Sequence, residues 1–103
     1  MPPAFFTNFE EPGEIISGKS FDVFQVISEN AALVNGPETR LFGDNIYYTG
    51  PVYRIRNYNG KYYYDDEIIK VPKGKVVRQT GIYKYQTKSE DYKTVPIIEI
   101  VDK

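Results

Sequence analysis

The densest group of side chains that could do chemistry is the carboxylate run Asp65-Asp66-Glu67. Two converging acids could hold a cation or act as general acid and general base. In a strand, however, successive side chains point to opposite faces, so Asp65 and Asp66 cannot act on one substrate. The spacing of a calcium-binding loop is also absent around this run. We therefore expect a solvated strand end, where Asp65 offsets the charge of Arg54 across a hairpin.

A second motif is a literal match to the phosphate-binding loop G-x-x-x-x-G-K-[ST] at residues 13–20. In nucleotide-binding proteins this loop follows a buried strand and opens a helix of a parallel sheet. Here Glu10-Glu11-Pro12 comes before the match, and a strand-like run starting at Phe21 comes after it. We therefore expect no nucleotide site, and a magnesium-dependent rise in melting temperature with nucleotide would contradict this expectation.

The composition excludes several kinds of catalytic site, because the 103 residues include no histidine and no cysteine. Without cysteine there are no disulfides, thiolate nucleophiles, iron–sulfur clusters or ordinary structural zinc sites. Without histidine, Ser-His-Asp and Cys-His catalysis are impossible and the commonest metal ligand is missing. Acid–base chemistry would need carboxylates, lysine or tyrosine with pKa values shifted by burial. We therefore predict a protein that is not an enzyme, with no catalytic residues, no cofactor and no metal.

The ten tyrosines are the most unusual feature of the composition. A dense group lies in the middle of the chain: Tyr47, Tyr48, Tyr53, Tyr58, Tyr62, Tyr63 and Tyr64. Tyrosine offers a large, rigid, amphipathic contact area, and it is enriched at recognition surfaces for that reason. A small barrel could also bury part of these rings and keep their hydroxyl groups at its rim. Both interpretations stay open at the level of the sequence.

Asn59-Gly60 is the clearest local structural signal, because Asn-Gly between alternating runs is typical of a two-residue hairpin loop. In such a hairpin Tyr58 faces Lys61, and the pairing assigns every neighbouring side chain to a face. One face carries Arg54, Arg56, Tyr58, Lys61, Tyr63 and Asp65. The other carries Tyr53, Ile55, Asn57, Tyr62, Tyr64 and Asp66. Only the second face contains an aliphatic residue, so we predict that it packs on the core and that the first faces solvent.

The outward face of this hairpin is the predicted partner-binding site, formed by Arg54, Arg56, Tyr58, Lys61 and Tyr63. Tyrosine and arginine are the usual anchors of protein interfaces, so we predict recognition of a protein or peptide partner. Self-association into a homo-oligomer through unpaired strand edges is a further option. The same face could instead stack the bases of a single-stranded nucleic acid. The sequence pI near 5.4 argues against that alternative. Carbohydrate binding ranks third, because tryptophan is absent.

Residues 1–19 precede these elements and are predicted to form an extended N-terminal arm. The arm is interrupted by prolines and glycines, which disfavour a helix. Its aromatic residues are Phe5, Phe6 and Phe9. An arm with so many aromatic rings is usually tied down, so we expect it to pack on its own domain. Residues 20–103 are predicted to form that single small β-barrel domain.

Ser28-Glu29-Asn30 interrupts the strand-like run that begins at Phe21. Ser28 could cap a short helix, or Glu29-Asn30 could be a hairpin tip with Asn30 in a left-handed conformation. We favour the hairpin, because a two-turn helix without a capping acid is marginal. Residues 35–45 are predicted to form the longest loop, with Leu41-Phe42 folded back as an anchor.

The C-terminal third reads as a turn followed by two long strands. Residues 71–74 predict a turn with proline at its second position. A strand over residues 76–87 follows, with Gly81 at a bulge or bend. The last strand covers residues 92–101, and Pro96 requires an edge or a bulge there, since proline cannot donate to a ladder.

These elements together predict an all-β fold with about five to seven short strands and no long helix. The nearest architecture is a small, partly open antiparallel β-barrel of the SH3-like or OB-like kind. The length of the chain favours one domain with one core. No stretch approaches the ~20 apolar residues that span a bilayer, so we expect no membrane span. The sequence leaves the cellular compartment open.

Overall fold

The computed structural model describes residues 4–39, 46–58, 60–86 and 89–103. All regular secondary structure in these residues is β-strand, which confirms the predicted all-β class. The strands are β1 (Ala4–Asn8), β2 (Ile15–Ile16), β3 (Ser20–Ser28), β4 (Ala31–Asn35), β5 (Glu38–Thr39), β6 (Ile46–Tyr47), β7 (Val52–Arg56), β8 (Ile68–Lys70), β9 (Lys75–Gln86) and β10 (Tyr92–Asp102). Within the described ranges, no helix is long and apolar enough to cross a membrane.

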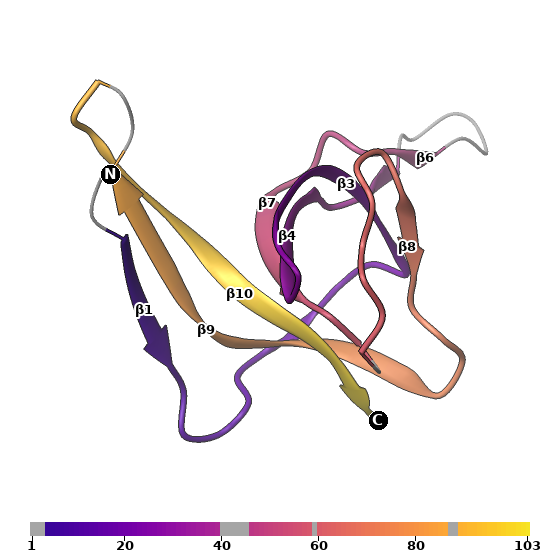
Figure 1. Ribbon diagram of the computed structural model, residues 1–103. Helices are drawn as coiled ribbons and strands as arrows, with labels where there is room; N and C mark the ends of the chain where they lie inside the picture. Colours follow the sequence, from indigo (N-terminus) through magenta and orange to yellow (C-terminus); the bar gives the residue numbers. More distant parts are fainter. Residues whose placement is uncertain (1–3, 40–45, 59, 87–88) are drawn as a thin grey trace.

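One mixed sheet of eight strands dominates the fold, with the order β1-β9-β10-β7-β4-β3-β8 and with β2 also paired to β9. Strands β5 and β6 form a separate two-stranded sheet. The pairing of β7 with β10 is parallel and joins Arg54 to Ile97 and Ile55 to Ile98. The prediction of a purely antiparallel sheet is therefore wrong at this pairing. The large sheet is strongly bent but is not closed into a barrel (Figure 1).

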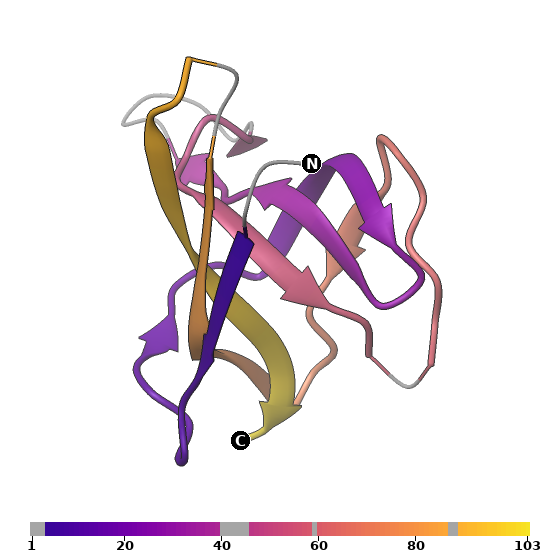
Figure 2. The same cartoon turned by 60° about the vertical axis from the view of Figure 1, so that its left-hand side comes forward.

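Strand β1 and the adjoining parts of β9 and β10 project from the rest of the sheet (Figures 1 and 2). We call this region, residues 4–8, 80–86 and 92–97, the wing. The register of β9 and β10 shifts where Ile97 faces Gly81 and Ile98 faces Gln79, which confirms the predicted bulge. A Cβ atom at Gly81 would lie 2.3 Å from the backbone oxygen of Thr7. Glycine is therefore required for β1 to approach β9 this closely.

Part of the predicted N-terminal arm packs on its own chain, since both β1 and β2 pair with β9. The Phe5 and Phe6 side chains nevertheless remain 55% and 51% exposed. The arm is thus held mainly by backbone pairing, and its rings are only half covered.

The hydrophobic core lies between the bent sheet of β3, β4, β7 and β8 and the C-terminal half of β10 with the start of β9. Its buried residues are Phe21, Val23, Ala32, Val34, Ile55, Tyr63, Ile69, Val77, Ile98 and Ile100. The alternation of β7 places Ile55 in this core and its neighbours Arg54 and Arg56 on the opposite face. Ring contact extends the core to Tyr53, whose ring meets that of Phe21 edge-on at 6.0 Å.

The predicted hairpin at Glu29-Asn30 is confirmed, whereas other details of the predicted turns differ. Ser28 pairs with Ala31, so Glu29-Asn30 is the tip of a hairpin. Asn30 does not adopt the expected left-handed conformation, which non-glycine residues of the described ranges adopt only at Asp66 and Glu90. The turn before β9 lies one residue later than predicted, because the Lys75 N–H donates to the Pro72 carbonyl at 3.1 Å. The predicted anchor Leu41-Phe42 lies outside the described residues.

The two long C-terminal strands are also confirmed as β9 and β10. Pro96 pairs with Ile82 of β9, and the pairing of β10 with β7 begins only at Ile97. Pro96 therefore sits where the other side of β10 has no ladder partner among the described strands, as its missing N–H demands.

The predicted hairpin around Asn59-Gly60 is wrong, although the chain does turn there. The Lys61 N–H donates to the Tyr58 carbonyl at 3.1 Å, and Gly60 has a φ of 70°. Asn59 itself lies outside the described residues. Residues 60–67 form no strand, and β7 pairs instead with β4 and β10. Because both edges of β7 are occupied, the returning chain cannot pair with it.

The segment after this turn follows β3 instead. The Asp66 N–H donates to the Val23 carbonyl at 2.7 Å, and the Val23 N–H donates to the Glu67 carbonyl at 2.8 Å. The Asp65 carboxylate accepts a hydrogen bond from the Val26 N–H at 2.8 Å, so it does not face Arg54 as predicted.

Candidate binding surface

The five residues of the predicted binding site do not share one face. Tyr63 is only 6% exposed and belongs to the core, so its predicted outward position is wrong. Its hydroxyl donates a hydrogen bond to the Arg56 carbonyl at 2.9 Å. Tyr58 is half-buried against the core, and the exposed Lys61 binds the Glu67 carboxylate at 2.5 Å. Only Arg54 and Arg56 keep the predicted position on the face of β7 opposite Ile55.

The two tyrosines that were predicted to be inside are the exposed ones. Tyr62 is 58% exposed and Tyr64 is 69% exposed, on either side of the buried Tyr63. The predicted inward and outward positions of these tyrosines are therefore reversed. They had been assigned from a pairing of this segment with β7, and that pairing does not form.

Arg54 is in contact with aromatic rings from two other strands. Its guanidinium carbon lies 4.5 Å from the centroid of the Phe6 ring and 4.8 Å from that of Tyr83. The Phe6 and Tyr83 rings are themselves 4.9 Å apart, and Tyr83 stacks on Tyr85 at 5.3 Å with an interplanar angle of 26°. We call Phe6, Arg54, Tyr83 and Tyr85 the aromatic-arginine face.

Strand register accounts for this arrangement. Phe6 pairs with Tyr83 across β1 and β9, so the two rings meet on one side of the wing. Tyr85 follows Tyr83 by two residues and therefore points the same way. Arg54 on β7 pairs with Ile97 on β10, and its long side chain reaches across β10 to the rings on β9 and β1.

The surroundings of the two arginines differ. Burial lowers the pKa of Arg54, and its Nε is buried without a hydrogen-bond partner in the described part of the chain. Arginine stays protonated near neutral pH, so Arg54 presents a cation that is stabilised mainly by ring faces. Arg56 instead contacts the Asn8 side-chain oxygen and the Glu99 carboxylate, the latter at 3.5 Å. The Nε–H of Arg54 is thus a donor without an acceptor in the described part of the chain.

Strand β1 borders this face and ends the large sheet. Its sequence Ala4-Phe5-Phe6-Thr7-Asn8 contains no charged residue, and its outer edge pairs with no described strand. On the other side of the wing, the Lys84 ammonium lies 4.9 Å from the centroid of the Tyr92 ring. Uncharged edge strands with exposed rings are sites at which another extended chain can pair.

Sequence reasoning missed Phe6, Tyr83 and Tyr85 as candidate site residues. The alternation Tyr83-Lys84-Tyr85 did indicate two rings on one side of a strand. Nothing in the local pattern indicated that β1 and β7 would bring Phe6 and Arg54 to those rings, because these contacts join distant parts of the chain.

Residues 13–20, which match the sequence of the phosphate-binding loop, do not fold as that loop does in nucleotide-binding proteins. Strand β2 lies within the match, and strand β3 follows it in place of a helix. Ser20 is buried, and its hydroxyl shares a 2.8 Å hydrogen bond with the hydroxyl of Tyr48. Its oxygen therefore has a partner within the protein. The described residues also contain no group of three or more acids that could hold a metal ion.

Comparison with known proteins gives no guidance on function. No protein-family model matches the chain, and neither curated proteins nor solved structures give a significant match.

Proposed function

We propose that the chain is a non-enzymatic module that binds a protein or peptide, with the aromatic-arginine face and the adjoining edge of β1 as its docking surface. The observation behind this proposal is the contact of the Arg54 guanidinium with the Phe6 and Tyr83 rings. The Nε of Arg54 has no hydrogen-bond partner in the described residues, and the Phe6 ring beside it is half exposed. Arginine and aromatic residues are the side chains that contribute most to protein interfaces.

The geometry suits an extended peptide. A strand added to β1 would use the backbone groups on its free edge, while side chains of the partner would contact Phe6 and the rings beyond it. Arg54 could then donate to a carbonyl or carboxylate of the partner. A second copy of the chain, pairing through its own β1, is one such partner. Of the five residues predicted from the sequence, Arg54 belongs to this surface, whereas Arg56 contacts Asn8 and Glu99 instead.

Selection from a random peptide library on the immobilised full chain tests the proposal. We expect the unchanged protein to enrich peptides that the double variant Phe6→Ser, Tyr85→Ser no longer binds. The matched control is Tyr62→Ser, Tyr64→Ser, which removes two exposed rings elsewhere on the surface. The control should bind the same peptides as the unchanged protein. Equal binding by all three proteins, at equal melting temperatures, would refute the proposed surface.

Sedimentation over a range of protein concentrations tests the self-association form of the proposal. If a second copy is the partner, the dimer fraction rises with concentration for the unchanged protein and the control. The Phe6→Ser, Tyr85→Ser variant should remain monomeric under the same conditions. Dimers that persist in this variant would contradict self-association through the wing.

Binding of single-stranded nucleic acid is the second candidate, favoured by the stacked pair Tyr83 and Tyr85 beside Arg54. With this candidate goes the predicted partly open barrel of the OB-like or SH3-like kind, since OB-like barrels bind single strands. Titration of a labelled oligonucleotide at two salt concentrations separates the candidates. Affinity that falls steeply with salt supports phosphate contacts, and absence of binding at low salt excludes the nucleic-acid candidate.

A further inference from the structure

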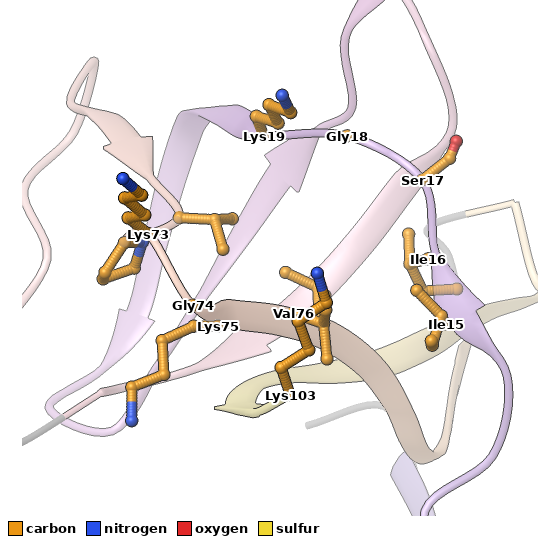
Figure 3. A pocket seen from close by; sticks show the side chains of 13 residues that line it. Ile15, Ile16, Ser17, Gly18, Lys19, Lys73, Gly74, Lys75, Val76 and Lys103 are labelled. Atoms are coloured by element: carbon orange, nitrogen blue, oxygen red, sulfur yellow. The ribbon is translucent and has the colours of Figure 1, made fainter.

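A cavity of about 550 Å³ shares no lining residue with the aromatic-arginine face, and no local sequence pattern indicated it. It is lined by residues 15–19, residues 71–77 and Lys103 (Figure 3). These segments are β2 with the chain leading to β3, the turn after β8 with the first residues of β9, and the residue that follows β10. Its size falls within the range of about 300–1,000 Å³ typical of small-molecule sites.

The lining of this cavity combines apolar walls with positive charge. The apolar walls come from Ile15, Ile16, Val71, Pro72, Val76 and Val77. The charges come from Lys19, Lys73, Lys75 and Lys103, and no aspartate or glutamate is among the lining residues. The positive charges of these lysines repel one another, and each of them attracts an anion. An anion bound in the cavity would therefore be stabilised by all of the lysines.

Only one of these four lysines has an ion-pair partner in the described residues. Lys75 binds the Asp102 carboxylate, whereas no described ion pair includes Lys19, Lys73 or Lys103. Figure 3 shows the ammonium group of Lys75 directed away from the other three in that view. Three lysines without an ion-pair partner among the described residues therefore border an apolar cavity.

We propose that this cavity binds a small amphiphilic anion, with an apolar body against the isoleucine and valine walls and an acidic head group near Lys19, Lys73 and Lys103. The apolar walls favour removal of a ring or short alkyl chain from water. The lysines favour a carboxylate, phosphate or sulfonate over a neutral or cationic head group. The site does not use the phosphate-binding geometry of a nucleotide loop, because β3 follows residues 13–20 where a helix would be needed.

Fluorescence titration of the full chain with anilinonaphthalene sulfonate tests this proposal, and the neutral compound phenylnaphthylamine serves as its uncharged counterpart. We expect saturable binding of the sulfonate, at least about tenfold tighter than binding of the neutral probe, which corresponds to about 1.4 kcal/mol. Equal affinity for the two probes would overturn the role of the lysines.

Two variants with the same change in net charge separate local from general electrostatics. The triple variant Lys19→Gln, Lys73→Gln, Lys103→Gln should weaken sulfonate binding about tenfold or more. The matched control Lys70→Gln, Lys84→Gln, Lys93→Gln removes three lysines outside the cavity and should leave the affinity nearly unchanged. An equal loss in both variants, or no loss in either at unchanged melting temperature, would overturn the proposal.

Competition and chemical-shift mapping define the ligand and the place. Decanoate and decyl phosphate should displace the probe, and the stronger competitor identifies the preferred head group. Inorganic phosphate alone should not displace it, and if it does so equally well the apolar part of the proposal is wrong. Amide shifts should concentrate in residues 15–19 and 71–77, and shifts confined to the wing would overturn the site. The Phe6→Ser, Tyr85→Ser variant should bind the probe normally, so this proposal and the proposed function fail independently.

Discussion

Tyr63 in the core and Tyr83 on the wing show how differently this chain uses the same residue type. Tyr63 is 6% exposed, and its hydroxyl has a fixed acceptor in the Arg56 carbonyl. Tyr83 is only partly buried, and the contacts recorded for its ring are with Phe6, Tyr85 and the Arg54 side chain. Tyrosine acts as a structural residue where its hydroxyl is bonded inside the core. On the wing the tyrosine ring stays in partial contact with solvent, beside the half-exposed ring of Phe6.

Truncation of the two rings should give the largest contrast between the regions. Tyr63→Ala removes a buried aromatic side chain, and we expect a loss of about 3 to 5 kcal/mol in the free energy of unfolding. Tyr83→Ala should cost less, because its ring already contacts solvent. Urea denaturation of both variants measures the difference. Similar losses would mean that the aromatic-arginine face is part of the folding core.

Substitution of Gly81 should disturb the wing and leave the core intact. In Gly81→Ala the new Cβ atom would clash with the Thr7 backbone oxygen, so β1 must move away. We expect a loss of about 1 to 3 kcal/mol, as for other overpacked sites. Faster amide exchange in residues 5–8, with unchanged exchange at Ile55, would localise the effect. Gly74→Ala is the comparison for location. Its φ of 83° makes alanine strained there too, but no atom lies within 4 Å of the new Cβ, so the strain should stay in the turn before β9 and leave amide exchange in residues 5–8 unchanged.

Ionisation of Tyr63 offers a pH test of the core alone. Burial, reinforced by the charge of Glu67, raises the pKa of Tyr63 from 10.0 to about 12. The folded state therefore favours the neutral phenol, and this contribution to stability is complete below pH 10. It is lost as the pH rises from 10 towards 12. Urea denaturation across this interval should show a steeper fall for the unchanged protein than for Tyr63→Phe. Equal slopes would contradict the burial of this hydroxyl.

Replacement of Arg54 should have the smallest effect on stability. Arg54→Met keeps apolar contact with the Phe6 and Tyr83 rings but removes the buried Nε that lacks a partner. The lost cation–π attraction is worth about 0.5 to 2 kcal/mol, and the removed desolvation cost offsets part of it. We expect a change in melting temperature of only a few degrees. Peptide binding should be lost, and binding that persists would separate Arg54 from the proposed function.

Local signals predicted the fold where the neighbouring strands were also close in sequence. The hairpin at Glu29-Asn30 formed as expected, because β3 and β4 each had a free edge for the other. The turn at Gly60 also formed, yet the chain beyond it did not become a strand. One edge of β7 pairs with β4 and the other with β10, so neither edge is open to that part of the chain. No pattern within residues 53–66 could reveal a partner that begins at residue 92.

The candidate surface was predictable only in part for the same reason. Alternation along β7 correctly separated Arg54 and Arg56 from Ile55, since this depends on one strand. The positions of Tyr62, Tyr63 and Tyr64 depended on the wrong hairpin and were reversed. The rings that contact Arg54 are those of Phe6 and Tyr83, which lie far apart in the sequence. The pairing of β1 with β9 brings them together. The lysines around the cavity likewise come from three separated segments.

The pairing of β1 with β9 also has a consequence for synthesis of the protein. Residues 4–8 leave the ribosome well before their partners, residues 81–85, so all the residues between them must be made before this ladder can form. Until then Phe5 and Phe6 lie in an uncharged extended segment that can associate with other nascent chains. Translation speed and chaperone supply should therefore affect the yield of native protein, and charged residues placed before β1 should improve it.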